Sequence, residues 1–205
     1  MAFENYSTLQ TNIADWLNRE DLTSQIPAFI RLFEARANRV LRTHDMIKRA
    51  TAFTDNGYFS VPPDWHETVS LMLLTDRLRP LEFVSIAKSL ELRAERRGGA
   101  PSHYTHIDGK FYLVPEPTDE LELELIYRAK VEPLSGDTAT NWLLDKSPDL
   151  YLFGALSEAE PYLKNDDRVA LWQAKANQII TDMHYEAERA SMPQGKLTAK
   201  QRTFG

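Results

Sequence analysis

The sequence predicts an α+β fold in which helices from both ends of the chain form a bundle and a small antiparallel β module is inserted between them. Apolar residues recur at helical spacing near both termini. Between them the period falls to two, most clearly in Glu120–Leu125, where Glu and Leu alternate. With 205 residues, we expect a bundle from 1–47 and 145–190, the inserted module from 48–144 with one short helix, and an extended tail from 191–205.

Two helices are predicted at the amino-terminal end. A Ser-x-x-Gln capping box indicates a first helix over Ser7–Asn18. The second is expected to begin between Thr23 and Pro27, because proline is tolerated only in the first turn, and to run to about His44. Their apolar stripes are Leu9, Ile13, Trp16 and Leu17, and then Ile26, Phe29, Ile30, Phe33, Ala37, Val40 and Leu41.

The polar face of the second helix is basic. Residues 31–49 hold six basic and two acidic side chains, and Arg36, Arg39 and Arg42 form a stripe because they are three residues apart. Such a stripe can bind phosphate, pair with an acidic partner, or face solvent. Residues 116–124 hold five acids and no base, so the two patches would also permit head-to-tail contacts between copies.

The middle of the chain predicts one antiparallel sheet of about six or seven strands. Hairpin turns are expected at Asp55–Gly57, Thr75–Arg77 and Asp108–Gly109. A short helix capped by Ser85 should end at Gly98–Gly99. Its inward side is expected to be Ile86, Leu90 and Ala94, and the core side of the last strand is expected to be Leu121, Leu123, Leu125 and Tyr127.

Two further helices are predicted near the carboxyl end. Ser147–Pro148 is a typical helix start, and Pro161 should end or kink that helix. Asp166–Asp167 opens the last helix, whose apolar seam is Val169, Trp172, Ala176, Ile179, Met183, Ala187 and Ala190. The nearest partners for these stripes are those of the first two helices, which predicts the bundle.

Several kinds of chemistry lack their usual residues. The chain has no cysteine, which excludes disulfides and thiolate zinc sites. It also has no phosphate-binding glycine motif and no Gly-x-Ser-x-Gly elbow. His103 and His106 cannot easily share a metal, because residues three apart on a strand face opposite sides. We therefore expect no catalytic residue, metal or cofactor.

Charge and hydropathy exclude further classes of protein. The net charge of −6 argues against a nucleic-acid regulator, which needs a basic surface. No apolar run approaches the roughly 20 residues that span a bilayer, and residues 1–5 show no secretory signal. We expect no membrane association.

Several short motifs occur in an order that resembles a known family. They are Ile26–Arg36, Arg39–Arg42, Val61–Trp65, Gly99–Tyr104, Leu113–Pro117, Asn141–Leu144 and Pro148–Ala159. In this order, from about Asp15 to Ala190, the chain resembles the head-to-tail adaptor (connector) proteins of tailed bacteriophages. Each motif alone is weakly specific, and Pro161 departs from the smooth helix expected there.

The resemblance implies a structural protein of the virion neck, between capsid and tail, assembled in the host cytoplasm. It would form a ring, typically of twelve copies, that joins the portal to the tail tube or nozzle. DNA would pass through without sequence-specific binding, and an acidic wall suits this because it repels phosphates.

The resemblance also implies partner-binding residues. The carboxyl-terminal segment of such proteins often reaches the portal, so Lys196, Lys200, Arg202 and Phe204 are expected to bind it. Arg36, Arg39 and Arg42 are expected to pair with a neighbouring subunit. The alternatives are a non-viral scaffold protein and a virion-associated hydrolase that acts on the cell wall. The hydrolase would need a catalytic Glu158, His103 or His106.

Overall fold

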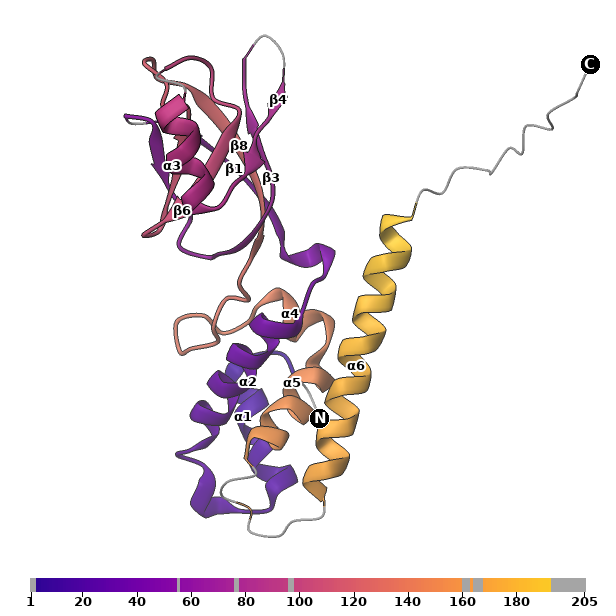
Figure 1. Ribbon diagram of the computed structural model, residues 1–205. Coiled ribbons are helices and arrows are strands. Elements are labelled where there is room, and N and C mark those ends of the chain that lie inside the picture. Colours follow the sequence, from indigo (N-terminus) through magenta and orange to yellow (C-terminus); the bar gives the residue numbers. More distant parts are fainter. Residues whose placement is uncertain are drawn as a thin grey trace, which may run out of the picture.

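A computed structural model shows a helical part and a β module joined by a narrow waist (Figure 1). It describes residues 3–54, 56–75, 78–95, 98–159, 163 and 168–192, with only the backbone of Glu20. Helices lie at both ends of the described chain and strands lie between them, which confirms the predicted α+β class. No helix in these ranges is long and apolar enough to cross a membrane.

The helical part surrounds one central helix. Its helices are α1 (Tyr6–Leu17), α2 (Ile26–Val40), α4 (Trp142–Lys146), α5 (Pro148–Glu158) and α6 (Arg168–Ser191), with short 3-10 turns at Glu20–Leu22 and His44–Met46. Residues on all sides of α5 are buried, including Leu150, Tyr151 and Ala155. This helix packs against α1, α2, α4 and α6, so segments from both ends of the chain share one core.

The ends of α1 and α2 differ from the predictions. Asn5 caps α1 in place of Ser7: its Oδ1 accepts from the Thr8 backbone N–H at 3.0 Å, and Thr8 Oγ1 accepts from the Asn5 N–H at 3.0 Å. Asparagine is as good an N-cap as serine, so the box forms two residues earlier. Helix α2 ends at Val40 because Leu41 is already extended, with ψ of 136°.

Helices α2 and α5 approach each other closely at a glycine. A Cβ atom at Gly154 would overlap the ring of Phe33. The Phe33 ring also packs edge-on against Tyr151, with centroids 5.1 Å apart. The close approach of these two helices therefore depends on the absence of a side chain at Gly154.

The β module consists of two four-stranded sheets. Its strands are β1 (Ile47–Phe53), β2 (Tyr58–Ser60), β3 (Trp65–Leu73), β4 (Arg79–Pro80), β5 (Glu82–Phe83), β6 (His103–Ile107), β7 (Lys110–Val114) and β8 (Glu122–Ala129). Sheet A has the order β1-β8-β3-β4 and sheet B the order β2-β7-β6-β5. The sheets enclose a second core, which includes Leu123, Leu125 and Tyr127 as predicted. The expectation of a single sheet was wrong.

The first predicted hairpin was also wrong. Strand β1 pairs with β8 and β2 pairs with β7, so the chain passes from sheet A to sheet B between them. Asn56 and Gly57 do adopt positive φ, at 49° and 78°, while Asp55 lies outside the described residues. The hairpin at Asp108–Gly109 is confirmed, since β6 and β7 form an antiparallel pair around it.

Helix α3 (Ile86–Glu95) packs on the outer face of sheet B. The side of the helix that contacts the sheet is opposite to the side predicted from the sequence. It packs on β6 and β7, and Ser89 is 2% exposed whereas Ile86 and Leu90 are 51% and 60% exposed. Ala94 is exposed too. A small residue allows a helix to lie close on a sheet, so this contact buries Ser89 and leaves the apolar stripe in solvent.

Helix α6 leaves the bundle after Met183, about two-thirds of the way along its 24 residues. Its buried positions are Val169, Trp172, Ala176, Ile180 and Met183, and no residue of α6 beyond Met183 is buried. The predicted seam positions Ala187 and Ala190 are half-buried and exposed. The upper part of α6 rises beside the waist instead (Figure 1). Pro161 and Asp166–Asp167 lie outside the described residues.

Candidate functional site at the waist

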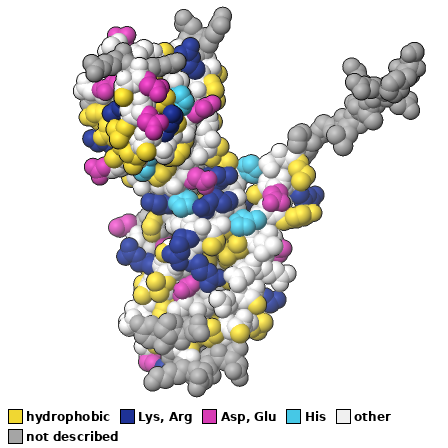
Figure 2. Space-filling view, viewed as in Figure 1, with side chains coloured by type: hydrophobic (Ala, Val, Ile, Leu, Met, Phe, Trp, Pro, Cys, Tyr) yellow, Lys and Arg dark blue, Asp and Glu magenta, His cyan; other side chains and the backbone are white. Residues whose placement is uncertain are grey.

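Basic and histidine side chains gather at the waist, as Figure 2 shows. Here the end of α2, the start of β1, strand β8 and the upper part of α6 enclose an open groove of about 360 Å³. Its lining residues are Arg42, Thr43, His44, Ile47, Arg128, His184, Ala187, Glu188 and Ser191. The waist is thus the place where three segments distant in sequence meet: residues 42–47, strand β8 and the upper part of α6.

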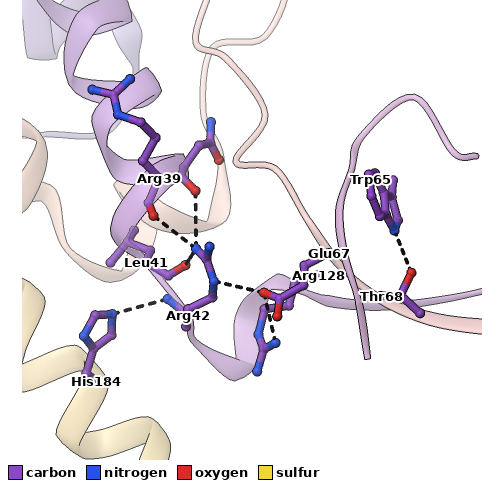
Figure 3. Close-up of polar contacts among 9 residues, drawn as sticks. Arg39, Leu41, Arg42, Trp65, Glu67, Thr68, Arg128 and His184 are labelled. Atoms are coloured by element: carbon purple, nitrogen blue, oxygen red, sulfur yellow. Dashed lines mark hydrogen bonds and ion pairs between the residues drawn. The ribbon is translucent and has the colours of Figure 1, made fainter. Parts of the chain in front are cut away.

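Arg42 connects three of the elements at the waist (Figure 3). Its Nη1 donates to the Leu41 carbonyl oxygen at 2.6 Å, at the end of α2, where a cation is favourable. Its Nε lies 3.0 Å from Glu67 Oε2 on β3. Its backbone N–H donates to His184 Nε2 on α6 at 3.3 Å. One residue therefore ties the bundle, the module and α6 together.

The Glu67 carboxylate is shared by two guanidinium groups. Arg128 Nη1 lies 3.4 Å from the same Oε2 atom that Arg42 contacts. Burial lowers the pKa of the neighbouring His66, and the positive charge of Arg42 lowers it further. These groups are partly exposed, so each ion pair contributes little stability and chiefly sets orientation.

Two histidines fasten the upper part of α6 to the waist. His44 Nε2 lies 3.1 Å from the Ala187 carbonyl oxygen, so this nitrogen must carry the hydrogen. His184 Nε2 accepts from the Arg42 N–H and therefore carries none. The His184 side chain is half-buried at this position.

The predicted arginine stripe divides between contacts within the chain and solvent. Arg36 Nη1 donates to Glu158 Oε1 at 3.0 Å and to Ser157 Oγ at 3.1 Å, which joins α2 to α5. Arg42 contributes to the waist. Arg39 has an exposed side chain. The role of these three residues between subunits stays a prediction, and Lys196, Lys200, Arg202 and Phe204 lie outside the described residues.

Sequence reasoning missed a buried polar network in the bundle. Glu34 is 3% exposed, and its Oε1 accepts from the Leu134 N–H at 2.8 Å and from the Tyr151 hydroxyl at 3.0 Å. Asn141 Nδ2 donates to the same hydroxyl at 2.7 Å. Burial raises the pKa of both Glu34 and Tyr151. Position 34 falls on the apolar side of α2 with Ile30, which is the sequence signal for its burial.

Of the candidate residues for hydrolysis, Glu158 lies on α5 of the bundle, whereas His103 and His106 both lie on β6 of the module. Glu158 pairs with Arg36. His103 Nδ1 lies 2.9 Å from Ser102 Oγ. The ring of His106 packs 4.9 Å from that of Trp65. No group of three potential metal ligands occurs in the part of the chain that the structure describes.

The protein thus consists of a bundle shared by both ends of the described chain and a β module inserted between them, with charged contacts where the two parts meet. The chain matches the SU10 adaptor protein family over residues 4–198 and therefore belongs to that family. This confirms the resemblance to phage head-to-tail adaptors. Membership implies a structural adaptor role in a phage virion, at the neck, in association with portal and tail components. No curated protein matches the chain.

Proposed function

We propose that the protein assembles into a ring, typically of twelve copies, between the portal and the tail tube or nozzle of a phage, and that DNA passes through this ring. The observation that carries the proposal is the family match across nearly the whole chain. The elongated shape in Figure 1 supports it, because rods can pack side by side into a wall. Assembly would take place in the host cytoplasm.

Apolar side chains on the outside of the bundle support contacts between copies. Leu32 and Val40 on α2 are 52% and 39% exposed, Trp16 on α1 is 37% exposed, and Leu171 on α6 is 57% exposed. Large exposed apolar side chains are typical of surfaces that bind other proteins. We place the contacts between neighbouring copies on the bundle for this reason.

The arginine stripe is proposed to contribute to the same contacts. The test combines Arg36→Glu with Arg39→Glu, which should prevent ring assembly. Arg36 also binds Glu158 within the chain, so its replacement could act by destabilising the fold. Arg39→Glu alone avoids this problem: if assembly is lost while the melting temperature is unchanged, a contact between copies has been removed. Arg79→Glu, at an exposed site on β4 and away from the proposed contacts on the bundle, is the matched control. Intact assembly of both arginine variants would refute this role.

The carboxyl-terminal segment is proposed to bind the portal. Lys196, Lys200 and Arg202 would meet acidic portal residues, and Phe204 would fill an apolar pocket. Replacing the three basic residues by Gln should weaken portal binding without changing the melting temperature. Unchanged portal binding would remove this segment from the interface.

The ring itself is tested by mixing the protein with its cognate portal and imaging the particles. We expect an added ring below the portal. A protein that stays monomeric in solution is compatible with the proposal, because the portal can act as the template. The absence of any added density on the portal would contradict it.

We also propose that the protein is not an enzyme. The family is one of structural phage adaptors, and the carboxylate of Glu34 is engaged in hydrogen bonds within the bundle. The hydrolase alternative predicts that Glu158→Gln, His103→Ala or His106→Ala abolishes cell-wall hydrolysis and leaves assembly unchanged. We expect no hydrolysis by the unsubstituted protein in the same assay.

A further inference from the structure

Strand β1 is a long edge strand with an open side. It lies at the end of sheet A and pairs with β8 over seven residues, from Ile47 to Phe53. Within the described residues, no backbone hydrogen bond joins β1 to a strand on its other side. Its side chains are exposed or half-buried throughout. An edge of this length offers unpaired N–H and C=O groups to an added strand.

The charges on this edge are arranged with the cations outermost. The Lys48 side chain is 57% exposed whereas its partner Asp64 is 33% exposed. The Arg49 side chain is 69% exposed and covers Glu124, whose side chain is 11% exposed. Each cation is thus more exposed than the carboxylate it pairs with, and the two cations lie on opposite faces of sheet A because adjacent strand residues alternate.

The open edge continues into the groove at the waist. Ile47, the first residue of β1, lines that groove together with Arg42 and Arg128. These two guanidinium groups share the single carboxylate of Glu67, and Glu188 is the only carboxylate among the residues that line the groove. The basic surface thus extends from the first residues of β1 to the waist.

We propose that β1 is a docking edge that takes an extended acidic segment of a partner protein as an additional strand of sheet A. Backbone hydrogen bonds would supply affinity, and carboxylates opposite Lys48 and Arg49 would select the partner. The same two cations disfavour pairing of β1 with β1 of a second copy, because like charges on adjacent strands repel. This interaction is additional to ring formation and does not depend on it.

The probe is a nine-residue peptide with pairs of adjacent Glu residues between Val and Thr residues. Adjacent Glu residues face opposite sides of a sheet, as Lys48 and Arg49 do on β1. Binding to the full chain is measured by fluorescence anisotropy, and backbone protection by hydrogen–deuterium exchange. We expect the amides of residues 47–53 that face away from β8 to exchange quickly in the free protein and several-fold more slowly with the peptide. Added-strand pairing predicts protection there and not in β6, which lies inside sheet B.

Two control peptides separate strand addition from simple charge attraction. One has the same charge with proline at its centre, which removes a backbone donor, and the other has Lys in place of Glu. Both should bind at least tenfold more weakly than the probe. Equal binding of the proline peptide would show charge attraction only and would overturn the proposal, as would a lack of probe binding at millimolar concentration.

Neutral substitutions test the role of the two cations. Lys48→Gln combined with Arg49→Gln should weaken binding of the probe by about fivefold, as expected for two exposed charge pairs. The control Lys175→Gln, which also removes one positive charge but at an exposed site on α6, should leave binding unchanged. Unaltered binding by the double variant, with its melting temperature retained, would exclude β1 as the docking edge.

Discussion

Single residues in the bundle hold together segments that are far apart in sequence. Glu34 on α2 accepts hydrogen bonds from Leu134 in the linker after β8 and from Tyr151 on α5. One turn further along α2, Asn38 Oδ1 accepts from the Val131 N–H at 2.7 Å. These two side chains attach the linker that returns from the β module to the bundle. Because the linker N–H groups would otherwise be buried without acceptors, each bond also avoids a desolvation cost.

The stability of the protein should depend on pH through Glu34. Burial raises the pKa of Glu34 in the folded state above the ordinary value of 4.5. At a pH between the pKa of the unfolded state and that of the folded state, the folded protein holds a proton that the unfolded chain releases. The free energy of unfolding should therefore fall as pH rises through that window. Glu34→Gln keeps a carbonyl acceptor and should abolish this slope in urea titrations. The control variant Glu91→Gln, at an exposed position, should keep the dependence of stability on pH. If Glu34→Gln also kept it, another group would be responsible.

Adding one methyl group at Gly154 should destabilise the protein. The Cβ of Gly154→Ala would overlap the Phe33 ring, and overpacking of this kind costs about 2 kcal/mol. The free energy of unfolding in urea measures the loss, and Phe33→Leu in the same chain should recover part of it. Gly136→Ala is the matched control, since a Cβ there meets no atom within 4 Å. Equal stability of the two alanine variants would contradict the packing described for α2 and α5.

At the scale of elements, α6 has two parts with different surroundings. As far as Met183 it contributes to the bundle core, and beyond that point it is held through His44 and His184. These two contacts join side chains to backbone atoms at partly exposed positions. Local stability depends on buried apolar contacts, so the upper part of α6 should open more readily than the lower part.

Hydrogen exchange should distinguish the two parts of α6. Amides of residues 184–191 should exchange at least tenfold faster than those of residues 172–183, because only the latter are backed by the core. His184→Ala should speed exchange in the upper part and leave the lower part unchanged. Uniform protection along the whole helix would contradict this division.

At the scale of the whole molecule, two separate cores are joined by a polar waist. One core lies in the bundle and the other between sheets A and B. The contacts at the waist are mainly ion pairs and hydrogen bonds centred on Arg42. Because partly exposed polar contacts are weak individually, the orientation of the module should be easier to change than either core.

Arg42→Gln should allow a wider range of angles between the bundle and the β module without unfolding either. The chain has no native cysteine, so spin labels at Lys175→Cys in the bundle and Thr51→Cys in the module can report their separation. We expect a broader distance distribution and a melting temperature within a few degrees of the parent. Arg19→Gln is the control, since Arg19 pairs with Asp21 within the bundle. An unchanged distribution would show that Arg42 does not set the orientation.

Local patterns in the sequence were enough to predict the class of fold and most of the elements. The apolar stripes on both terminal pairs of helices predicted a shared bundle, because a stripe on a helix must be buried against another element. The alternation at Leu121, Leu123 and Leu125 predicted which side of β8 faces the core. The order of short motifs was sufficient to indicate the family.

Only the tertiary structure decided which elements meet. Whether β1 pairs with β2 or with β8 depends on backbone hydrogen bonds between distant segments, and the turn residues at Asn56 and Gly57 are compatible with either. Likewise, the position of α3 on sheet B decides which side of that helix is buried, and this side carries Ser89 and not Leu90. The sequence by itself determined the periodicity of most elements and hence the α+β class of the fold. The partners of Glu34 and Arg42, and the open edge of β1, required three-dimensional packing, since contacts between segments far apart in sequence leave no local pattern.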